Sequence, residues 1–297
     1  MTTVVSGPDT ATIDDAPGDP PTPARDKPPR NWSAIGLVMR KDLTAVKRSK
    51  AIMLPMILVP AVLLIAMPVA LGLFARSAPT SQLDTALSSP MISNLAKPIL
   101  QLPQKEQLIV LVLGYLLSPL LLVIPLMVSA VLAADAFAGE KERRTLDGLL
   151  YLPISDRDLF LAKVLGAFAP ALAITWIGAI VYATLSNVIG WPVTHRLFIP
   201  FTQWTMVMVW IAPAIALLAL GLLVIVSSRA RTTQEANQLG GAVILPLIFL
   251  AAGEASALLL APLLAIFLVG VVIWGIAVGL LVINGRRFTR DRLATSS

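Results

Sequence analysis

The sequence lacks cysteine and contains a single histidine, His195, among its 297 residues. Without cysteine, the chain can form no disulfide, thiol nucleophile or zinc site with cysteine ligands. A single histidine also excludes any site that needs two. Charged residues are scarce as well, because they make up 13% of the chain, against about 25% in an ordinary soluble domain.

Hydrophobic residues, in contrast, make up 57% of the chain, and the mean hydropathy is +0.82. So few charges cannot cover a water-facing surface, and lipid must therefore solvate most of the apolar side chains. We expect a membrane protein.

Long uncharged runs predict where the chain crosses the membrane. About 20 apolar residues are enough to span the hydrocarbon of a bilayer. Four runs meet this requirement: 51–75, 108–134, 164–185 and 204–226. A last apolar stretch, 239–283, contains one charge, Glu254, and suits two helices joined by a tight turn at 254–256, which keeps the carboxylate away from the bilayer centre. The sequence therefore predicts an all-α membrane protein with six transmembrane helices.

Local signals refine these spans. Five prolines fall inside the first two runs: Pro55, Pro60, Pro68, Pro119 and Pro125. Because lipid-embedded helices tolerate proline where neighbours satisfy the freed carbonyls, we expect kinks and not helix ends. Ser155 and Asp158 have the spacing of a capping box, which predicts a helix start just before the third run. Gly275 and Gly279 have the spacing that lets the last span pack closely on a neighbour.

The distribution of Lys and Arg predicts the orientation. With six spans, 19 of these residues fall on the side of the termini and four on the other side. Positive residues favour the cytoplasmic side, so both termini are expected in the cytoplasm. This asymmetry also accounts for the net charge of +6, and no nucleic-acid partner is expected.

The segments outside the six-span domain, residues 51–285, differ from one another. Residues 1–30 are rich in proline and predict a disordered cytoplasmic tail, and residues 286–297 form a basic cytoplasmic tail. Residues 31–50 predict an amphipathic helix at the membrane surface. Its apolar face comprises Trp32, Ile35, Met39, Leu43 and Val46. The alternative is that its basic residues serve only the positive-inside rule.

The loop between spans two and three predicts a short charged helix. Glu140 has helical spacing to Arg143 and Arg144, while a group of leucines shares another side before Pro153 ends the helix. Such a helix on the cytoplasmic side suits a soluble partner. The alternative is a solvated connector that only orients the two spans.

This loop resembles the pattern of ABC-2 type permeases, the membrane subunits of a class of ATP-binding-cassette transporters. The matching residues are Gly139, Glu140, Lys141, Glu142, Arg143, Arg144, Thr145, Leu146, Leu149, Leu150, Pro153, Ser155 and Lys163. The chain departs from the family at Arg144 and at Ala162, where glycine is usual. Residues 234–241 and 287–293 are similar to sodium-efflux members, and the helix at 31–50 is similar to the family's interfacial elbow helix.

The resemblance implies how the chain works and with what. The residues from Gly139 to Leu150, with Pro153, become a coupling helix that binds a separate ATPase subunit. No Gly-x-x-x-x-Gly-Lys-Ser/Thr loop occurs in the sequence, so ATP and Mg²⁺ belong to that partner, and this chain is expected to be neither an enzyme nor a cofactor carrier. A second permease subunit, identical or similar, is implied, as are export and a location in the plasma membrane.

Three other functions compete with this interpretation. An intramembrane protease would need histidines that the chain lacks. An ion-coupled secondary transporter would need an ionisable group at membrane depth, and the one candidate is Glu254, which is expected at an extracellular gate or in a solvated turn. A structural or assembly protein is the third alternative. Co-purification with an ATPase distinguishes the ABC permease from the others.

Overall fold

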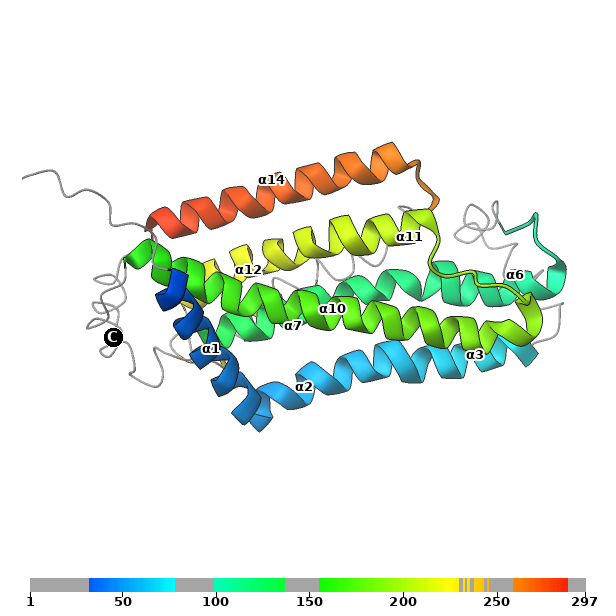
Figure 1. Cartoon of the computed structure of the whole chain (residues 1–297), viewed down its shortest axis with the longest axis horizontal. Helices are drawn as coiled ribbons and strands as arrows, with labels where there is room; N and C mark the ends of the chain where they lie inside the picture. Colours follow the sequence, from blue (N-terminus) through cyan, green and yellow to red (C-terminus); the bar gives the residue numbers. More distant parts are fainter. Residues whose placement is uncertain are drawn as a thin grey trace, which may run out of the picture. The chain divides into compact units, whose positions relative to one another are not determined.

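The computed structural model describes residues 32–77, 99–136, 155–229, 232, 234–235, 238–242, 245 and 259–287. Within these residues every element of regular secondary structure is a helix (Figure 1). This confirms the predicted all-α class for the described part of the chain. Helices suit the apolar runs, since a backbone in lipid must satisfy its own hydrogen bonds.

Five helical stretches in the described residues are long and apolar enough to cross a membrane. They are Met56–Ser77, Gln104–Ala134, Asp156–Thr194, Thr202–Ser227 and Leu263–Arg286. These correspond to the predicted spans one, two, three, four and six. The expected fifth span and its turn at Glu254 lie mostly outside the described residues, so the count of six stays a prediction.

Three of these stretches change helix type along their length. The first span comprises α2 (Lys50–Ala61), η1 (Val62–Ala66) and α3 (Met67–Ser77). The second span comprises α6 (Gln104–Val110), η2 (Leu111–Leu116), η3 (Ser118–Leu122) and α7 (Val123–Ala134). The fourth span comprises α11 (Thr202–Met206), η5 (Val207–Ile211) and α12 (Ala212–Arg229). Here η1, η2 and η5 are π-helical and η3 is a 3-10 helix. The stretches continue past the prolines of the first two spans, as expected, because altered turns redistribute the bonds that proline removes.

The third span is much longer than its uncharged run. Helix α10 covers Asp156–Thr194, 39 residues, whereas the sequence predicted a span over 164–185. The difference arises because charges such as Lys163 delimit the apolar run without ending a helix. At 1.5 Å per residue α10 is about 58 Å long, nearly twice the roughly 30 Å of bilayer hydrocarbon. The predicted start is confirmed, since the Asp158 amide donates to Ser155 Oγ at 3.1 Å.

The second and fourth spans lie innermost in the bundle. In the most apolar 18-residue window of each, 67% is buried, against 39% for α10 and 22% and 17% for the first and last spans. Helix α12 packs against α7 and against α14 (Leu263–Arg287), and α10 packs against α7 and α3 (Figure 1). The outer spans therefore keep large apolar faces, which lipid or another subunit must cover.

Helix α14 is fastened to the fourth span through aromatic side chains. Trp274 Nε1 donates to the Trp210 carbonyl at 3.1 Å, and Trp210 Nε1 donates to the Phe267 carbonyl at 3.2 Å. A Cβ atom at Gly270 would lie 2.1 Å from Trp210 Nε1. In the described residues nothing lies within 4 Å of a Cβ at Gly275 or Gly279, so Gly270 makes the close approach that was predicted for those two.

The predicted amphipathic helix is present as α1 (Trp32–Arg48). Ile35 and Val46 of the predicted apolar face are buried, but Trp32 is 60% exposed and Val38 is buried in its place. The stripe thus begins at Ile35, one turn later than the sequence pattern indicated. The structure contains no membrane, so the interfacial position of α1 stays a prediction.

Candidate functional site

The predicted contact residues for the partner ATPase lie outside the described residues. These are Gly139, Glu140, Lys141, Glu142, Arg143, Arg144, Thr145, Leu146, Leu149, Leu150 and Pro153, together with the predicted gate residue Glu254. The structure describes instead the two points where the coupling loop, residues 137–154, leaves the bundle. We call the group formed by Asp135, Ala136, Ser155 and Lys163 the loop base.

Lys163 joins the two ends of the coupling loop. Its side chain is 2% exposed, and its Nζ atom donates to the Ala136 carbonyl at 2.5 Å. A buried ammonium is costly unless it is hydrogen bonded, and a cation at the end of a helix such as α7 is stabilised by the helix dipole. The bond therefore ties the end of span two to the beginning of span three.

Other features of the loop base also favour a fixed geometry. The Ser155 cap and two acidic residues in the first turn, Asp156 and Asp158, stabilise the start of α10. Asp135, directly after α7, is 7% exposed. Sequence reasoning quoted Lys163 as part of the family pattern but did not select it as a site residue. The signal was a charge placed two turns inside the helix, at the start of its apolar run.

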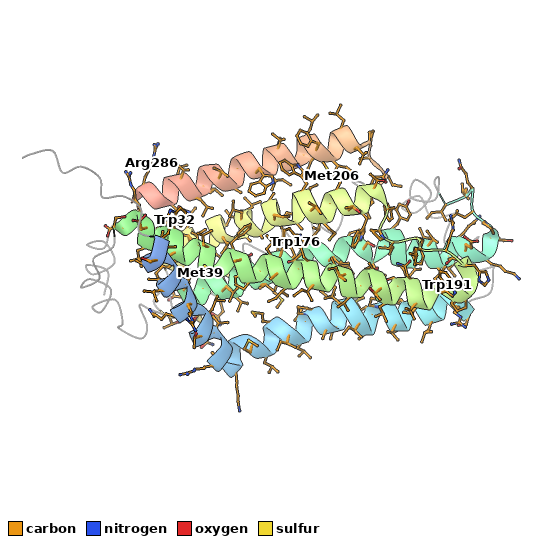
Figure 2. All side chains as sticks on the ribbon, in the orientation of Figure 1. Trp32, Met39, Trp176, Trp191, Met206 and Arg286 are labelled. Atoms are coloured by element: carbon orange, nitrogen blue, oxygen red, sulfur yellow. The ribbon has the colours of Figure 1, made fainter. Side chains whose placement is uncertain are left out.

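Helix α1 packs on the loop base side of α10 (Figure 2). Ile35 and Val38 form a small buried cluster with Leu159 and Ala162. The contact is close, since a Cβ atom at Gly166 would lie 3.5 Å from Met39 Cγ. The start of α10 is therefore in contact with α1 as well as with the end of span two.

A short stretch of α10, residues 176–182, contacts all three π-helical segments. Tyr182 Oη donates to the Leu113 carbonyl of η2 at 2.6 Å, and Trp176 Nε1 donates to the Met208 carbonyl of η5 at 3.1 Å. A Cβ atom at Gly178 would lie 2.6 Å from Leu64 Cδ1 of η1. We call this group the π contact belt. π-helical turns are frequent at functional sites and kinks because they leave carbonyls available to outside donors.

The belt contains polar atoms but no charge. Leu113 also accepts a hydrogen bond from Ser118 Oγ at 2.9 Å, so one carbonyl receives two hydroxyl groups. Both hydroxyl side chains are buried. The arrangement satisfies backbone groups in lipid without any ionised residue.

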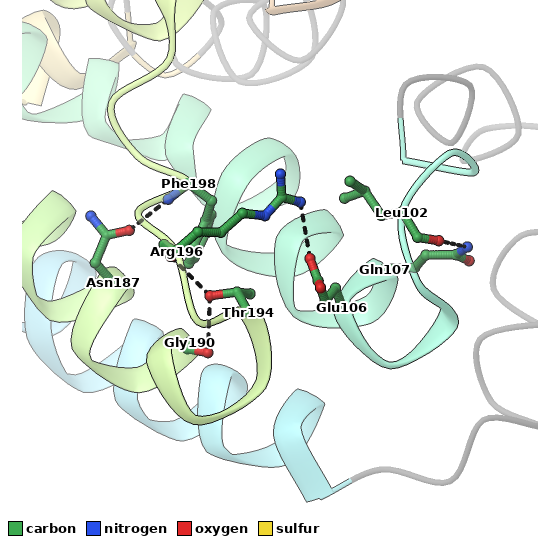
Figure 3. Close-up of polar contacts among 8 residues, drawn as sticks. All are labelled: Leu102, Glu106, Gln107, Asn187, Gly190, Thr194, Arg196 and Phe198. Atoms are coloured by element: carbon green, nitrogen blue, oxygen red, sulfur yellow. Dashed lines mark hydrogen bonds and ion pairs between the residues drawn. The ribbon is translucent and has the colours of Figure 1, made fainter.

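The opposite end of the bundle carries a second polar group, drawn in Figure 3. Arg196 and Glu106 form an ion pair with 2.9 Å between nitrogen and oxygen, which links the loop after α10 to α6. Thr194 Oγ1 donates to the Arg196 carbonyl at 2.9 Å. Asn187 Oδ1 accepts from the Phe198 amide at 3.0 Å, so this asparagine holds the same loop. No sequence pattern indicates that Glu106 and Arg196 form a pair, because these two residues are 90 positions apart in the chain.

The single histidine lies at this end too. His195 caps α10 in the left-handed conformation, with φ of 49°, and is exposed. Trp191 and Pro192 belong to the last turn of α10. Among the described residues, no three histidine, aspartate or glutamate side chains gather to hold a metal ion.

Comparison with known proteins agrees with this architecture. A family model described as "ABC-2 family transporter protein" matches residues 37–267. The match runs from α1 to the first turn of α14 and includes both the loop base and the π contact belt. No curated protein matches the chain significantly.

Proposed function

The chain belongs to the ABC-2 family of transporter proteins, and from this membership we propose that it is the permease subunit of an exporter driven by a separate ATPase. Family and apolar helices together make it a multi-pass membrane component of an ABC transporter. The ATPase, the direction of transport and the orientation are our proposals.

The loop base is the observation that carries this proposal. A partner that moves the coupling loop must pass the motion to the spans, and the bond from Lys163 to Ala136, which links the ends of spans two and three, supports such a path. Helix α10 then reaches the π contact belt, where it contacts the first, second and fourth spans. A soluble ATPase that binds residues Gly139–Leu150 would thus act on most of the bundle through one helix.

The chain itself is proposed to be neither an enzyme nor a carrier of a cofactor. ATP and Mg²⁺ would bind to the partner, because the sequence has no phosphate-binding loop of the required pattern. We propose both termini in the cytoplasm and a plasma-membrane location, which the excess of basic residues on the side of the termini supports.

A working transporter would contain two permease subunits and two ATPase subunits. The incompletely covered first and last spans support a second permease, identical or similar. A hydrophobic or amphipathic cargo suits the uncharged belt, whereas the likeness to sodium-efflux members favours a cation. A cation would give Glu254 a role at the extracellular gate.

Charge reversal in the coupling helix tests the ATPase contact. The double variant Glu140→Lys and Glu142→Lys should abolish transport and weaken co-purification of the ATPase, because two positive side chains would replace the two carboxylates that face the partner. Membrane insertion should be unchanged. The measurements are co-purification from detergent and ATP-dependent transport into inverted vesicles.

Lys105→Glu supplies the matched control, since it reverses an exposed charge at the other end of the bundle. Wild-type transport in the double variant would contradict the coupling assignment. Transport driven by an ion gradient in vesicles of the purified chain, without ATP, would instead support the secondary transporter.

A further inference from the structure

The surface of α10 near the Arg196 end contains a pocket of about 470 Å³. It is lined by side chains between residues 180 and 191 of α10, by Leu197, Ile199 and Pro200 of the following loop, and by Trp204 of α11. We propose that this pocket holds one acyl chain of an ester-linked phospholipid, with the Trp204 indole donating to an ester carbonyl.

The chemistry of the lining favours a hydrocarbon. Most of the wall is aliphatic or aromatic, and its hydroxyl and amide side chains, Thr184 and Asn187, are already bonded. Thr184 Oγ1 donates to the Ile180 carbonyl at 2.8 Å. Asn187 donates to the Ala183 and Ile199 carbonyls and accepts from two amides. Apart from the indole N–H groups, the wall therefore offers no free partner to a polar cargo, whereas an alkyl chain loses nothing there.

The length of the pocket fits one leaflet of a bilayer. It runs along α10 from Ile180 to Trp191, 11 residues apart, which is about 16 Å at the rise of an α-helix. Half of the hydrocarbon thickness is about 15 Å. The open side carries exposed apolar side chains, with Ile180 at 67%, Val188 at 65% and Leu197 at 71%. A lipid can thus enter from the membrane.

Trp204 provides an independent observation. It is 6% exposed, and its Nε1 atom has no hydrogen-bond partner among the described residues. A buried indole N–H normally has an acceptor, so its absence needs an explanation. Trp204 lies in the first turn of α11 and Trp191 in the last turn of α10. Tryptophans concentrate at this depth, where the polar groups of lipids begin, so an ester carbonyl supplies the missing acceptor.

Photolabelling of the full chain tests the site. The chain is reconstituted in phosphatidylcholine vesicles with a trace of phosphatidylcholine that carries a diazirine on one acyl chain, and labelled peptides are identified by mass spectrometry. Peptides of the pocket should be labelled more strongly than the exposed face of α14. In Ala183→Phe, whose ring fills the pocket, this excess should disappear, while label on α14 remains.

Ile177→Phe is the matched control, because Ile177 is 63% exposed on the same helix but does not line the pocket. It should leave the labelling unchanged. Equal labelling of the pocket and α14 in the wild type, unchanged labelling in Ala183→Phe, or crosslinks between two copies of the chain through the pocket would overturn the proposal. The measurement needs no transport, so it stands whether or not the coupling assignment holds.

Trp204→Phe tests the hydrogen bond and keeps the aromatic wall. The wild type should prefer ester-linked over ether-linked lipid by about 2- to 10-fold, the effect of one hydrogen bond. The variant should lose this preference. No preference in the wild type would overturn the role of Trp204, even if Ala183→Phe failed to fold.

Discussion

A lysine that is 2% exposed needs a strong partner, and Lys163 finds one in the Ala136 carbonyl, two residues after the end of α7. The hydrogen bond of this side chain thereby links two segments that are 27 residues apart in the chain. Because the coupling loop lies between those segments, the same bond fixes the distance between the two ends of the loop. We regard Lys163 as a positioning residue for coupling.

Replacement of this lysine should separate ATP hydrolysis from transport. Lys163→Met keeps the length of the side chain but removes the donor, and a hydrogen bond to a charged group contributes about 1.5–3 kcal/mol. We expect the ATPase still to bind, while transport per ATP hydrolysed falls about tenfold or more. Both rates are measured in the same proteoliposomes.

Lys50→Met provides the comparison, because Lys50 is an exposed lysine at the start of α2. It should behave as the wild type. Lys163→Arg retains a charged donor and should recover part of the coupling. An unchanged ratio of transport to hydrolysis in Lys163→Met would contradict a role of the Lys163–Ala136 bond in coupling.

At the scale of the elements, helix contacts depend on single small or aromatic residues whose partners the sequence does not reveal. The spacing of Gly275 and Gly279 predicted close packing at these two positions, but in the described residues the close contact lies at Gly270 instead. The reason is the Trp210 side chain of the fourth span, which lies directly over Gly270. Periodicity identifies candidate faces, whereas the partner comes from the three-dimensional arrangement.

Alanine substitutions at the glycines of α14 should therefore differ in effect. Gly270→Ala forces the Trp210 ring aside and disturbs its bond to the Phe267 carbonyl, with an expected cost of about 1–3 kcal/mol for overpacking. Gly275→Ala meets nothing within 4 Å among the described residues and should gain about 0.5–1 kcal/mol from helix propensity.

Thermal unfolding in detergent, followed by tryptophan fluorescence, measures both variants against the wild type. Gly270→Ala should unfold at a lower temperature and Gly275→Ala at the same or a slightly higher one. Equal shifts in the two variants would show that the contact over Gly270 does not stabilise the bundle.

At the scale of the whole molecule, the sequence predicted the class of fold and the positions of the described spans. Apolar runs of about 20 residues reflect the thickness of the bilayer hydrocarbon. The length of α10 was not predictable in the same way, since Ser155 and His195, and not the limits of the apolar run, end it. The loop base and the Glu106–Arg196 pair depend on tertiary contacts.

Cysteine labelling can establish the topology, because the chain has no cysteine to give background. Single variants at His195 and Glu254 should react with an impermeant maleimide added to intact cells, and variants at Arg157 and Arg290 only after the membrane is opened. Labelling of Arg290→Cys from outside would mean an odd number of spans, and labelling of Arg157→Cys would place the coupling loop outside.

The midpoint of α10, residue 175 of Asp156–Thr194, lies directly before the π contact belt at residues 176–182. A helix that is held near its centre by the contacts of the belt can tilt about that point. A tilt of about 10° would shift each end of a helix about 58 Å long by about 5 Å, in opposite directions. A displacement of the Lys163 end in one direction would move the loop at Arg196 in the opposite direction. The bundle would then close on one side of the membrane while it opens on the other.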